Sequence, residues 1–304
     1  MTENEFRELR APGGTTPPRH VLITGAARGI GRAVAEEFAA DGYALTLADQ
    51  DRDELERTAD RLAATTPAVA VTVDLTDPDA PARLVERAWQ ATGAVGAAGG
   101  VCGVDVLVNA AGVYPSLDMD EVRAEAWDRL FAVNVRAPVL ATAAFARLAA
   151  EHGTGGAVVN ISSGSALRAR PGGGPYASSK AALEMATRAA ALELGARGIR
   201  VNAVSPGFVP VASDRNPVSA RYAAAIGANP LGRPGTPRDI ARAVRWIAGP
   251  DASWITGEIL RVDGGSSTGA LHLPRIWPPD DHDETGGTAA TAHPPAEAGE
   301  GHHG

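Results

Sequence analysis

Seven short apolar runs, separated by segments of helical length and period, recur between residues 20 and 262. The runs are HVLIT (20–24), ALTLA (44–48), AVAVTV (68–73), DVLVN (105–109), AVVNI (157–161), RVNAV (200–204) and EILRV (258–262). Their length and β-branched content predict buried strands, whereas segments such as GRAVAEEFAADG and DELERTADRLAA have the period of amphipathic helices. This alternation is typical of a parallel sheet covered on both faces. With right-handed crossovers, it predicts a single doubly wound α/β domain with a seven-stranded parallel sheet.

Three segments interrupt the alternation and set the expected domain boundaries. Residues 1–19 form a polar leader that lacks the apolar centre of a signal peptide. Residues 93–103 contain five glycines in eleven positions, and because no helix follows them they predict a surface loop rather than a phosphate-binding turn. Residues 269–304 are rich in Pro, Gly, His and acids and are expected to be largely disordered beyond 279. The folded domain is therefore expected over 20–268.

Charge and cysteine content exclude several classes of protein. The chain has 28 basic and 36 acidic residues, a net charge of −8, which argues against nucleic-acid binding. Its single cysteine, Cys102, excludes an internal disulfide framework and a multi-cysteine zinc site. Only His20 and His152 precede residue 272, so no metal site is expected. No apolar run approaches the ~18 residues of a membrane span, and a soluble, cytoplasmic protein is expected.

The segment TGAARGIG (24–31) follows the first strand and opens a helix. Glycines in such a turn let backbone N–H groups and a helix N-terminus approach a pyrophosphate. The alternative is a tight turn without a ligand. Asp49 ends the second strand, where a carboxylate can accept hydrogen bonds from ribose hydroxyls. Together these features predict a dinucleotide site.

These and later motifs resemble the short-chain dehydrogenase/reductase family over roughly residues 20–266. The later motifs are VDLTD (73–77), NAAG (109–112), PYASSK (175–180), VNAVSPG (201–207) and ITGEILRVDGG (255–265). The resemblance implies a Rossmann-fold oxidoreductase that interconverts a ketone and a secondary alcohol with NAD(P). It implies cofactor contacts from Thr24, Gly25, Arg28, Gly29, Ile30, Gly31, Asp49, Asp74, Leu75, Asn109, Ala110, Gly112, Tyr176, Lys180, Pro206, Gly207 and Val209.

Two positions depart from the family pattern. Ala110 stands where a second Asn is usual, and because alanine fits a tight backbone we expect little effect. Val211 stands where a Thr often hydrogen-bonds the nicotinamide carboxamide, so that contact must come from backbone or water.

The choice between NAD(H) and NADP(H) rests on two residues of opposite charge. Asp49 would repel a 2′-phosphate and favours NAD(H). Arg28 favours NADP(H), because a base just before the second glycine often accompanies NADP binding in the family. The effect of Asp49 is expected to be the larger one, so NAD(H) is the expected cofactor. NADP(H) is not excluded, because of Arg28.

Tyr176 and Lys180 are four residues apart in a helical segment, which places both on one face. A phenol has a reference pKa of about 10, and a neighbouring ammonium is expected to lower it towards neutrality. The alternative is a helix-start tyrosine with a solvated lysine. Lys180 is the only lysine in the chain, and Ser163 lies at the end of a strand thirteen residues before Tyr176. Both features favour a catalytic reading.

The resemblance completes this set of candidate catalytic residues. It selects Ser163 over its neighbour Ser162 as the residue that holds the substrate oxygen. It also implies that Asn134 holds a water in a proton relay to Lys180. The alternative for Asn134 is a helix-interior residue that satisfies backbone groups.

The segment from about residue 209 to residue 234 is expected to form a mobile lid over the substrate. Candidate substrate contacts are Tyr114, Ser165, Leu167, Val211 and Tyr222, in a mixed apolar pocket. Arg168, Arg170, Arg215 and Arg221 are either anion contacts or solvated surface residues. The substrate is expected to be a small carbonyl or alcohol, which the sequence does not name.

The resemblance further implies a homotetramer, or a dimer, built on the helices near 121–150 and 176–197. The apolar stretch 271–277 is expected to dock on its own or a neighbouring subunit. There are two alternatives to this oxidoreductase function: a dinucleotide-sensing module without enzymatic activity, and a dehydratase or epimerase without net cofactor turnover.

Overall fold

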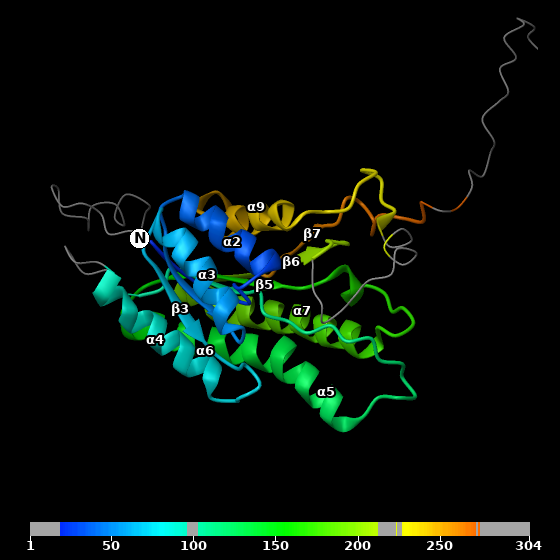
Figure 1. Ribbon diagram of the computed structural model, residues 1–304, viewed down its shortest axis with the longest axis horizontal. Helices are drawn as coiled ribbons and strands as arrows, with labels where there is room; N and C mark the ends of the chain where they lie inside the picture. Colours follow the sequence, from blue (N-terminus) through cyan, green and yellow to red (C-terminus); the bar gives the residue numbers. More distant parts are fainter. Residues whose placement is uncertain (1–18, 96–102, 212–222, 224–226, 272, 274–304) are drawn as a thin grey trace, which may run out of the picture. The chain divides into compact units, whose positions relative to one another are not determined.

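The computed structural model describes residues 19–95, 103–211, 223, 227–271 and 273. Seven strands form one parallel sheet, in the order β3-β2-β1-β4-β5-β6-β7 (Figure 1). They are β1 His20–Thr24, β2 Ala44–Asp49, β3 Ala68–Thr72, β4 Val106–Asn109, β5 Gly156–Ile161, β6 Ile199–Pro206 and β7 Ile259–Val262. All seven coincide with the apolar runs, and the predicted doubly wound fold is confirmed.

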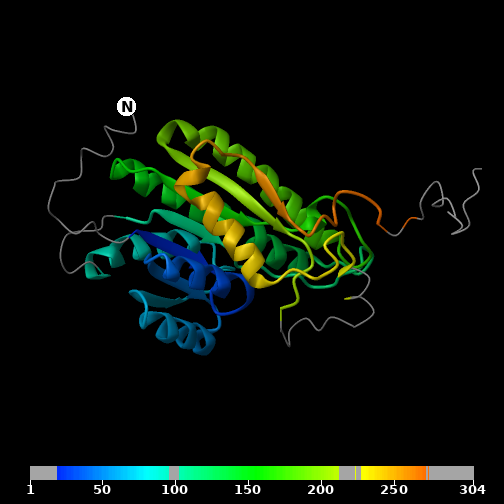
Figure 2. The ribbon, with the colours of Figure 1, turned by 90° about the horizontal axis from the view of Figure 1, so that it is seen from above.

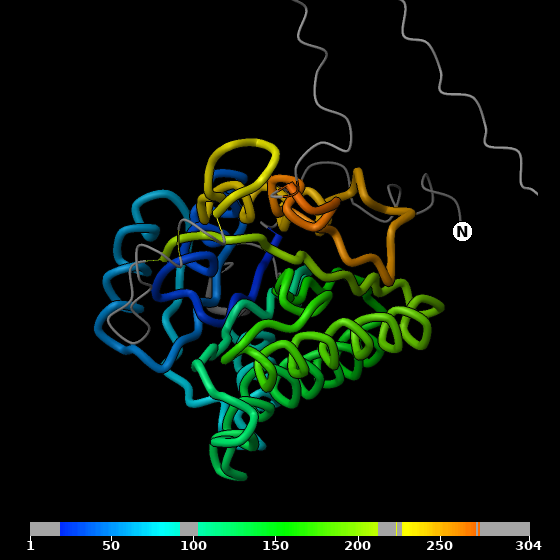
Figure 3. Tube along the Cα trace, turned by 90° about the vertical axis from the view of Figure 1, so that its right-hand side faces the viewer, coloured from blue at the N-terminus to red at the C-terminus, as the bar shows by residue number. Residues whose placement is uncertain are grey.

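Helices cover both faces of the sheet. The α-helices are α2 Gly29–Ala40, α3 Arg52–Ala63, α4 Ala80–Val95, α5 Ala124–Phe131, α6 Ala137–Glu151, α7 Gly174–Leu194 and α9 Pro237–Ala248. Helices α2, α3 and α9 pack on one face, and α4, α6 and α7 on the other (Figures 1 and 3). Helix α9 packs over β5 and β6 (Figure 2).

Alternate residues of the central strands divide the core into two layers. Val21 and Ile23 of β1 face the layer that contains α2, whereas Leu22 between them faces the layer that contains α4 and α6. This is the period of two that a strand imposes on its side chains. A strand buried on both faces is apolar throughout, which is why the seven runs were recognisable in the sequence.

The structure changes one expectation about the segments between strands. Helix α4 continues to Val95, so the expected loop starts later than residue 93, and residues 96–102 lie outside the described part. Gly93 is tolerated because a glycine in a helix costs only about 1 kcal/mol relative to alanine. The leader and almost all of the tail also lie outside the described residues.

Among the described residues, one helical stretch, Ala124–Glu151, is long and apolar enough to cross a membrane, contrary to the expectation that no such run occurs. It comprises α5, a π-helical turn at Ala132–Arg136, and α6. Of its most apolar 18-residue window, 61% is buried inside the fold, and a mostly buried core helix has the same length and composition.

The sheet order places the carboxyl ends of β1 and β4 side by side at the point where the strand order reverses. Thr24 pairs with Asn109 there, and β2 and β5 end beside them at Asp49 and Ile161. In doubly wound folds, ligands bind at this edge of the sheet.

Candidate active site

The turn between β1 and α2 needs its glycines for two different reasons. Gly25 and Gly29 have φ angles of +69° and +56°, in the left-handed region that side chains disfavour. A Cβ atom on Gly25 would also lie 2.7 Å from the backbone nitrogen of Ala111. Gly31 has no room for a Cβ, which would overlap the carbonyl oxygen of Gly25. The turn is therefore held tightly against the segment after β4.

The N-terminus of α2 is left without a side-chain cap. Arg28 occupies the capping position without a capping hydrogen bond, and the first turn has no acidic residue. By contrast, Asp51 caps α3 and Thr236 caps α9. The first N–H groups of a helix need acceptors, and an anion such as a pyrophosphate supplies them. This donor set fits the phosphates of a dinucleotide.

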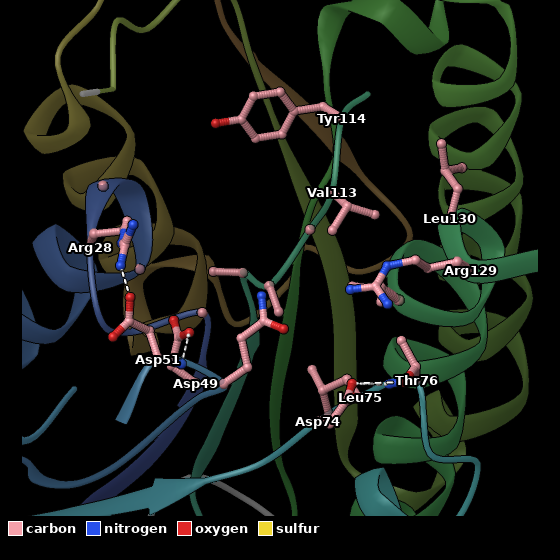
Figure 4. Close-up of a pocket in the computed structure, with 18 of the residues that line it drawn as sticks. Arg28, Asp49, Asp51, Asp74, Leu75, Thr76, Val113, Tyr114, Arg129 and Leu130 are labelled. Carbon is pink, nitrogen blue, oxygen red and sulfur yellow. Dashed lines mark hydrogen bonds and ion pairs between the residues drawn. The ribbon is translucent and has the colours of Figure 1, made fainter. Parts of the chain in front are cut away.

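A cavity of about 540 Å³ opens in front of this turn (Figure 4). Its lining includes most of the predicted cofactor residues, namely Gly25, Arg28, Gly29, Ile30, Gly31, Asp49, Asp74, Leu75, Ala110 and Gly112. On one side, the Asp49 carboxylate accepts hydrogen bonds from the backbone nitrogens of Ala27 (3.1 Å) and Asp51 (3.0 Å). These bonds hold the carboxylate at the edge of the cavity, where the resemblance places a ribose.

Asp74 follows β3, the strand next to β2, and lines the cavity beside Leu75 and Thr76 (Figure 4). Its carboxylate accepts hydrogen bonds from the Thr76 backbone nitrogen (2.9 Å) and hydroxyl (2.8 Å). These bonds are the main reason that the pKa of Asp74 is lowered, so the carboxylate is ionised at neutral pH.

Seven predicted cofactor residues do not line this cavity: Thr24, Asn109, Tyr176, Lys180, Pro206, Gly207 and Val209. Thr24 is buried, and its hydroxyl accepts hydrogen bonds from the backbone nitrogens of Ala110 and Ala111. Asn109 is also buried and donates to the side chain of Asn160 at 2.9 Å. Both side chains support the walls of the cavity from behind.

Val211, which was expected near both the nicotinamide carboxamide and the substrate, lies beside the glycine turn. It lines the cavity, and its side chain packs against Gly29, where an added Cβ would lie 2.9 Å from a Val211 methyl. Of the other substrate candidates, Tyr114 lines the cavity, Leu167 is exposed, and Tyr222 lies outside the described residues together with Arg215 and Arg221.

Ser163, Tyr176 and Lys180 come together beside this cavity. Ser163 follows β5, its hydroxyl accepts a hydrogen bond from the Ser165 backbone nitrogen at 3.1 Å, and it hydrogen-bonds the Tyr176 hydroxyl. The Lys180 ammonium donates to the Ile161 carbonyl at 2.8 Å and lies 5.9 Å from the centre of the Tyr176 ring. Helix α7 therefore places the tyrosine and the lysine on the same side, as the spacing predicted.

Gly112 connects this group to the nucleotide cavity, which it lines. A Cβ atom on Gly112 would lie 3.6 Å from the Lys180 nitrogen and 3.4 Å from the Asn134 amide oxygen. The lysine therefore approaches the cavity wall at a residue without a side chain.

Burial raises the pKa of Tyr176, while the Ser163 hydrogen bond and the charge of Arg170 lower it to a smaller extent. The lowering that was expected from Lys180 is therefore wrong for the protein without a bound cofactor. Burial also lowers the pKa of Lys180 to about 8. Desolvation disfavours the charged form of both side chains.

Asn134 lies in the π-helical turn between α5 and α6 and is fully buried. Its amide exchanges two hydrogen bonds with the Val113 backbone, at 2.9 Å from nitrogen to amide oxygen and 2.8 Å from amide nitrogen to carbonyl, and donates to Ser179 at 3.1 Å. It thus satisfies backbone groups, as the alternative stated, and it does so next to Gly112 and Lys180.

Several residues of the site were missed in the sequence, and two of them are acidic: Asp51 and Glu184. Asp51 lines the cavity and forms an ion pair with Arg28 (Figure 4). Glu184 is buried one helical turn after Lys180 and accepts a hydrogen bond from Ser162 at 2.8 Å. The position of Asp51, two residues after Asp49 at a helix start, was an available signal. No signal in the sequence indicated that Glu184 pairs with Ser162, because the two residues are 22 positions apart.

Among the described residues, no group of three or more His, Cys, Asp and Glu side chains is arranged to hold a metal ion.

Comparison with known proteins gives consistent matches across the folded region. A family model described as enoyl-(acyl carrier protein) reductase matches residues 25–267. A galactitol 2-dehydrogenase (L-tagatose-forming) of Cereibacter sphaeroides is 36% identical over 247 residues, which cover 80% of this chain and 92% of that protein.

Two solved structures are similar to this chain in both fold and sequence. A short chain dehydrogenase/reductase family protein aligns with a TM-score of 0.68 at 34% identity, covering 81% of this chain and 96% of that one. An acetoin dehydrogenase from Salmonella typhimurium aligns with a TM-score of 0.73 at 28% identity, covering 84% and 99%.

Proposed function

This chain belongs to the short-chain dehydrogenase/reductase family, and on that premise we propose that it interconverts a ketone and a secondary alcohol with NAD(H). The family membership makes it an oxidoreductase that acts on alcohol or carbonyl groups. The observation that carries the finer proposal is the group formed by Ser163, Tyr176 and Lys180 beside a cavity shaped for a dinucleotide.

A bound nicotinamide would give a hydride to the carbonyl carbon or take one from the alcohol carbon. In reduction, the Tyr176 hydroxyl donates the proton to the substrate oxygen, and the Ser163 hydroxyl holds that oxygen by a hydrogen bond. Lys180 keeps a positive charge next to the tyrosine and approaches the cavity wall at Gly112, where it would hold the nicotinamide ribose of a bound cofactor. Asn134 holds the Val113 backbone in place at the same wall.

The cofactor is held by the glycine turn, by the uncapped N-terminus of α2 and by Asp49. A carboxylate at the end of β2 binds ribose hydroxyls and repels a 2′-phosphate. We therefore assign a preference for NAD(H). Pro206, Gly207 and Val209 follow on the nicotinamide side, and Asp74 and Leu75 on the adenine side.

The substrate is proposed to be a small polyol, a vicinal diol or the matching ketone. Several relatives are named after polyols or a vicinal diol: a sorbitol dehydrogenase, a galactitol 2-dehydrogenase and an L-2,3-butanediol dehydrogenase. The Tyr114 ring lies 6.3 Å from that of Tyr176 in an edge-on arrangement. Its side chain therefore borders the place where a substrate would meet Tyr176.

The test is a panel of polyols, vicinal diols and their ketones with NAD⁺, NADH, NADP⁺ or NADPH, followed by the absorbance of the reduced nicotinamide. We expect turnover with at least one pair and a higher kcat/KM with NAD(H). Nucleotide binding without turnover of any substrate would favour a sensing module. Product formation without net change in the nucleotide would favour a dehydratase or epimerase.

For assembly, we propose a cytoplasmic homotetramer. The exposed side of α7 carries Met185 and Leu192, which are 62% and 86% exposed and lie seven residues apart on one helical face. Val139 of α6 is also exposed. Large apolar side chains in this position support an interface between copies of the chain.

A further inference from the structure

Arg28 and Asp51 meet at the rim of the nucleotide cavity. Arg28 belongs to the glycine turn before α2, and Asp51 to the turn between β2 and α3. Their ion pair joins the guanidinium to carboxylate oxygen Oδ2, and both residues line the cavity next to Asp49 (Figure 4). The chain's best candidate for binding a 2′-phosphate is thus already held by a carboxylate.

The other acidic groups nearby are engaged elsewhere. Both oxygens of Asp49 accept backbone N–H bonds, from Ala27 and Asp51. Glu54 faces Arg32 and Arg57. Asp51 is therefore the carboxylate that holds Arg28, while its second oxygen accepts the capping bond from the Glu54 nitrogen at 3.4 Å.

We propose that Asp51 is a specificity-determining residue that excludes NADP(H) by neutralising Arg28. An unpaired guanidinium at this position would bind a phosphate through two parallel hydrogen bonds. With Asp51 in place, a 2′-phosphate meets two carboxylates and a cation that must first give up its partner. This inference rests on the proposed nucleotide-dependent function and adds a second residue to the role of Asp49.

The test is direct binding of NAD⁺ and NADP⁺ by isothermal titration calorimetry, without substrate. In Asp51→Asn the amide oxygen retains the helix cap, but the charge that holds Arg28 is gone. We expect the ratio of the Kd for NADP⁺ to that for NAD⁺ to fall about five- to tenfold. Adding Arg28→Ala to this variant should abolish the gain, whereas Arg28→Ala alone should change the ratio by less than about twofold.

Asp53→Asn is the matched control. It removes the same charge from the first turn of α3, but Asp53 is exposed and does not line the cavity. In Asp53→Asn, the ratio of the Kd for NADP⁺ to that for NAD⁺ should equal the wild-type ratio. An unchanged ratio in Asp51→Asn would overturn the inference, as would a gain that survives the loss of Arg28, since Asp51 would then act by repulsion alone. Failure of the wild type to bind either nucleotide would instead contradict the proposed function.

Discussion

Tyr176 and Lys180 have surroundings that disfavour charge on both side chains. Burial raises the pKa of the phenol and lowers that of the ammonium to about 8. At neutral pH the tyrosine is therefore protonated and the lysine is mostly charged. This is the state from which a proton can be donated to a carbonyl oxygen, with the positive charge next to the phenolate that results.

Replacing Tyr176 by Phe keeps the ring and removes the proton donor. We expect kcat to fall by about 10²- to 10⁴-fold, the usual contribution of a positioned acid or base, while the Kd for NAD⁺ changes little. Steady-state kinetics and calorimetry measure the two quantities. Tyr43→Phe is the control, because Tyr43 packs against Phe38 outside the site. A Tyr176→Phe variant with nearly normal turnover would contradict the assignment.

The charge of Lys180 predicts a pH dependence. Because its pKa is about 8, the side chain loses its proton as the pH rises through that value. We expect kcat/KM for carbonyl reduction to be constant near neutrality and to fall above about pH 8. In Lys180→Arg the guanidinium stays charged, so this decrease should vanish, but the rate should be low at every pH because a planar head does not fit where a compact ammonium lies. A wild-type profile that stays flat to about pH 9 would argue against the role of Lys180.

At the scale of elements, polar contacts fasten α7 to β5 along their length. Lys180 bonds the Ile161 carbonyl, Glu184 accepts from Ser162, and the Thr187 hydroxyl accepts from Asn160 at 2.9 Å. Three turns of α7 thus contact three adjacent residues, 160–162, at the carboxyl end of β5. This arrangement sets the position of Tyr176 relative to Ser163 and explains why buried polar residues occur in an otherwise apolar interface.

Arg200 of β6 plays a comparable role for α9. Its half-buried guanidinium donates to the carbonyls of Ile247, Ala248 and Gly249 at the end of α9, and to that of Ile255. Arg200→Met should lower the free energy of unfolding by about 2–3 kcal/mol, because charged hydrogen bonds are lost and buried carbonyls lose their donor. Urea denaturation measures the change. The exposed Arg197→Met is the control, and equal effects of the two substitutions would contradict this role.

At the scale of the whole molecule, one buried histidine ties the stability of the sheet to pH. The side chain of His20 lies near Thr46 Oγ1 (2.9 Å) and the Gly103 carbonyl (3.3 Å), and burial lowers its pKa below 6.5. As the pH falls, the unfolded chain takes up this proton before the folded one does. The His20 contribution therefore makes stability decrease below about pH 6.5 and has no effect above it.

His20→Gln should reduce this dependence. We expect the loss of unfolding free energy between about pH 7.5 and about pH 5.5 to be smaller in the variant than in the wild type, as measured by urea denaturation. His152→Gln is the control, since His152 is exposed on the surface after α6. The same loss in the wild type and His20→Gln would show that other groups carry the acid sensitivity.

The proposed tetramer leads to a prediction about the tail. The segment 280–304 is acidic and nearly free of large apolar residues, whereas 271–277 includes Leu, Ile and Trp. Removal of 280–304 should change neither assembly nor turnover, and removal of 270–304 should weaken one of them. Light scattering and steady-state kinetics test both. Loss of assembly from the shorter deletion alone would contradict this division of the tail.

The sequence by itself determined the features that depend on neighbours along the chain. The seven strands follow from their apolar runs, the glycine turn from Gly25, Gly29 and Gly31, and the shared face of Tyr176 and Lys180 from the period of a helix. These properties are local, so composition and spacing are enough to predict them.

Only the tertiary structure decided the properties that depend on distant parts of the chain. The Arg28–Asp51 pair joins two turns 23 residues apart, and Val211 reaches Gly29 from beyond β6. The direction of the Tyr176 pKa shift depends on how deeply the fold buries the ring, which the spacing of Tyr176 and Lys180 along the chain does not reveal. Spacing along a chain predicts which side chains can meet, but it does not predict how much water the fold removes from around them, and that desolvation sets their charge.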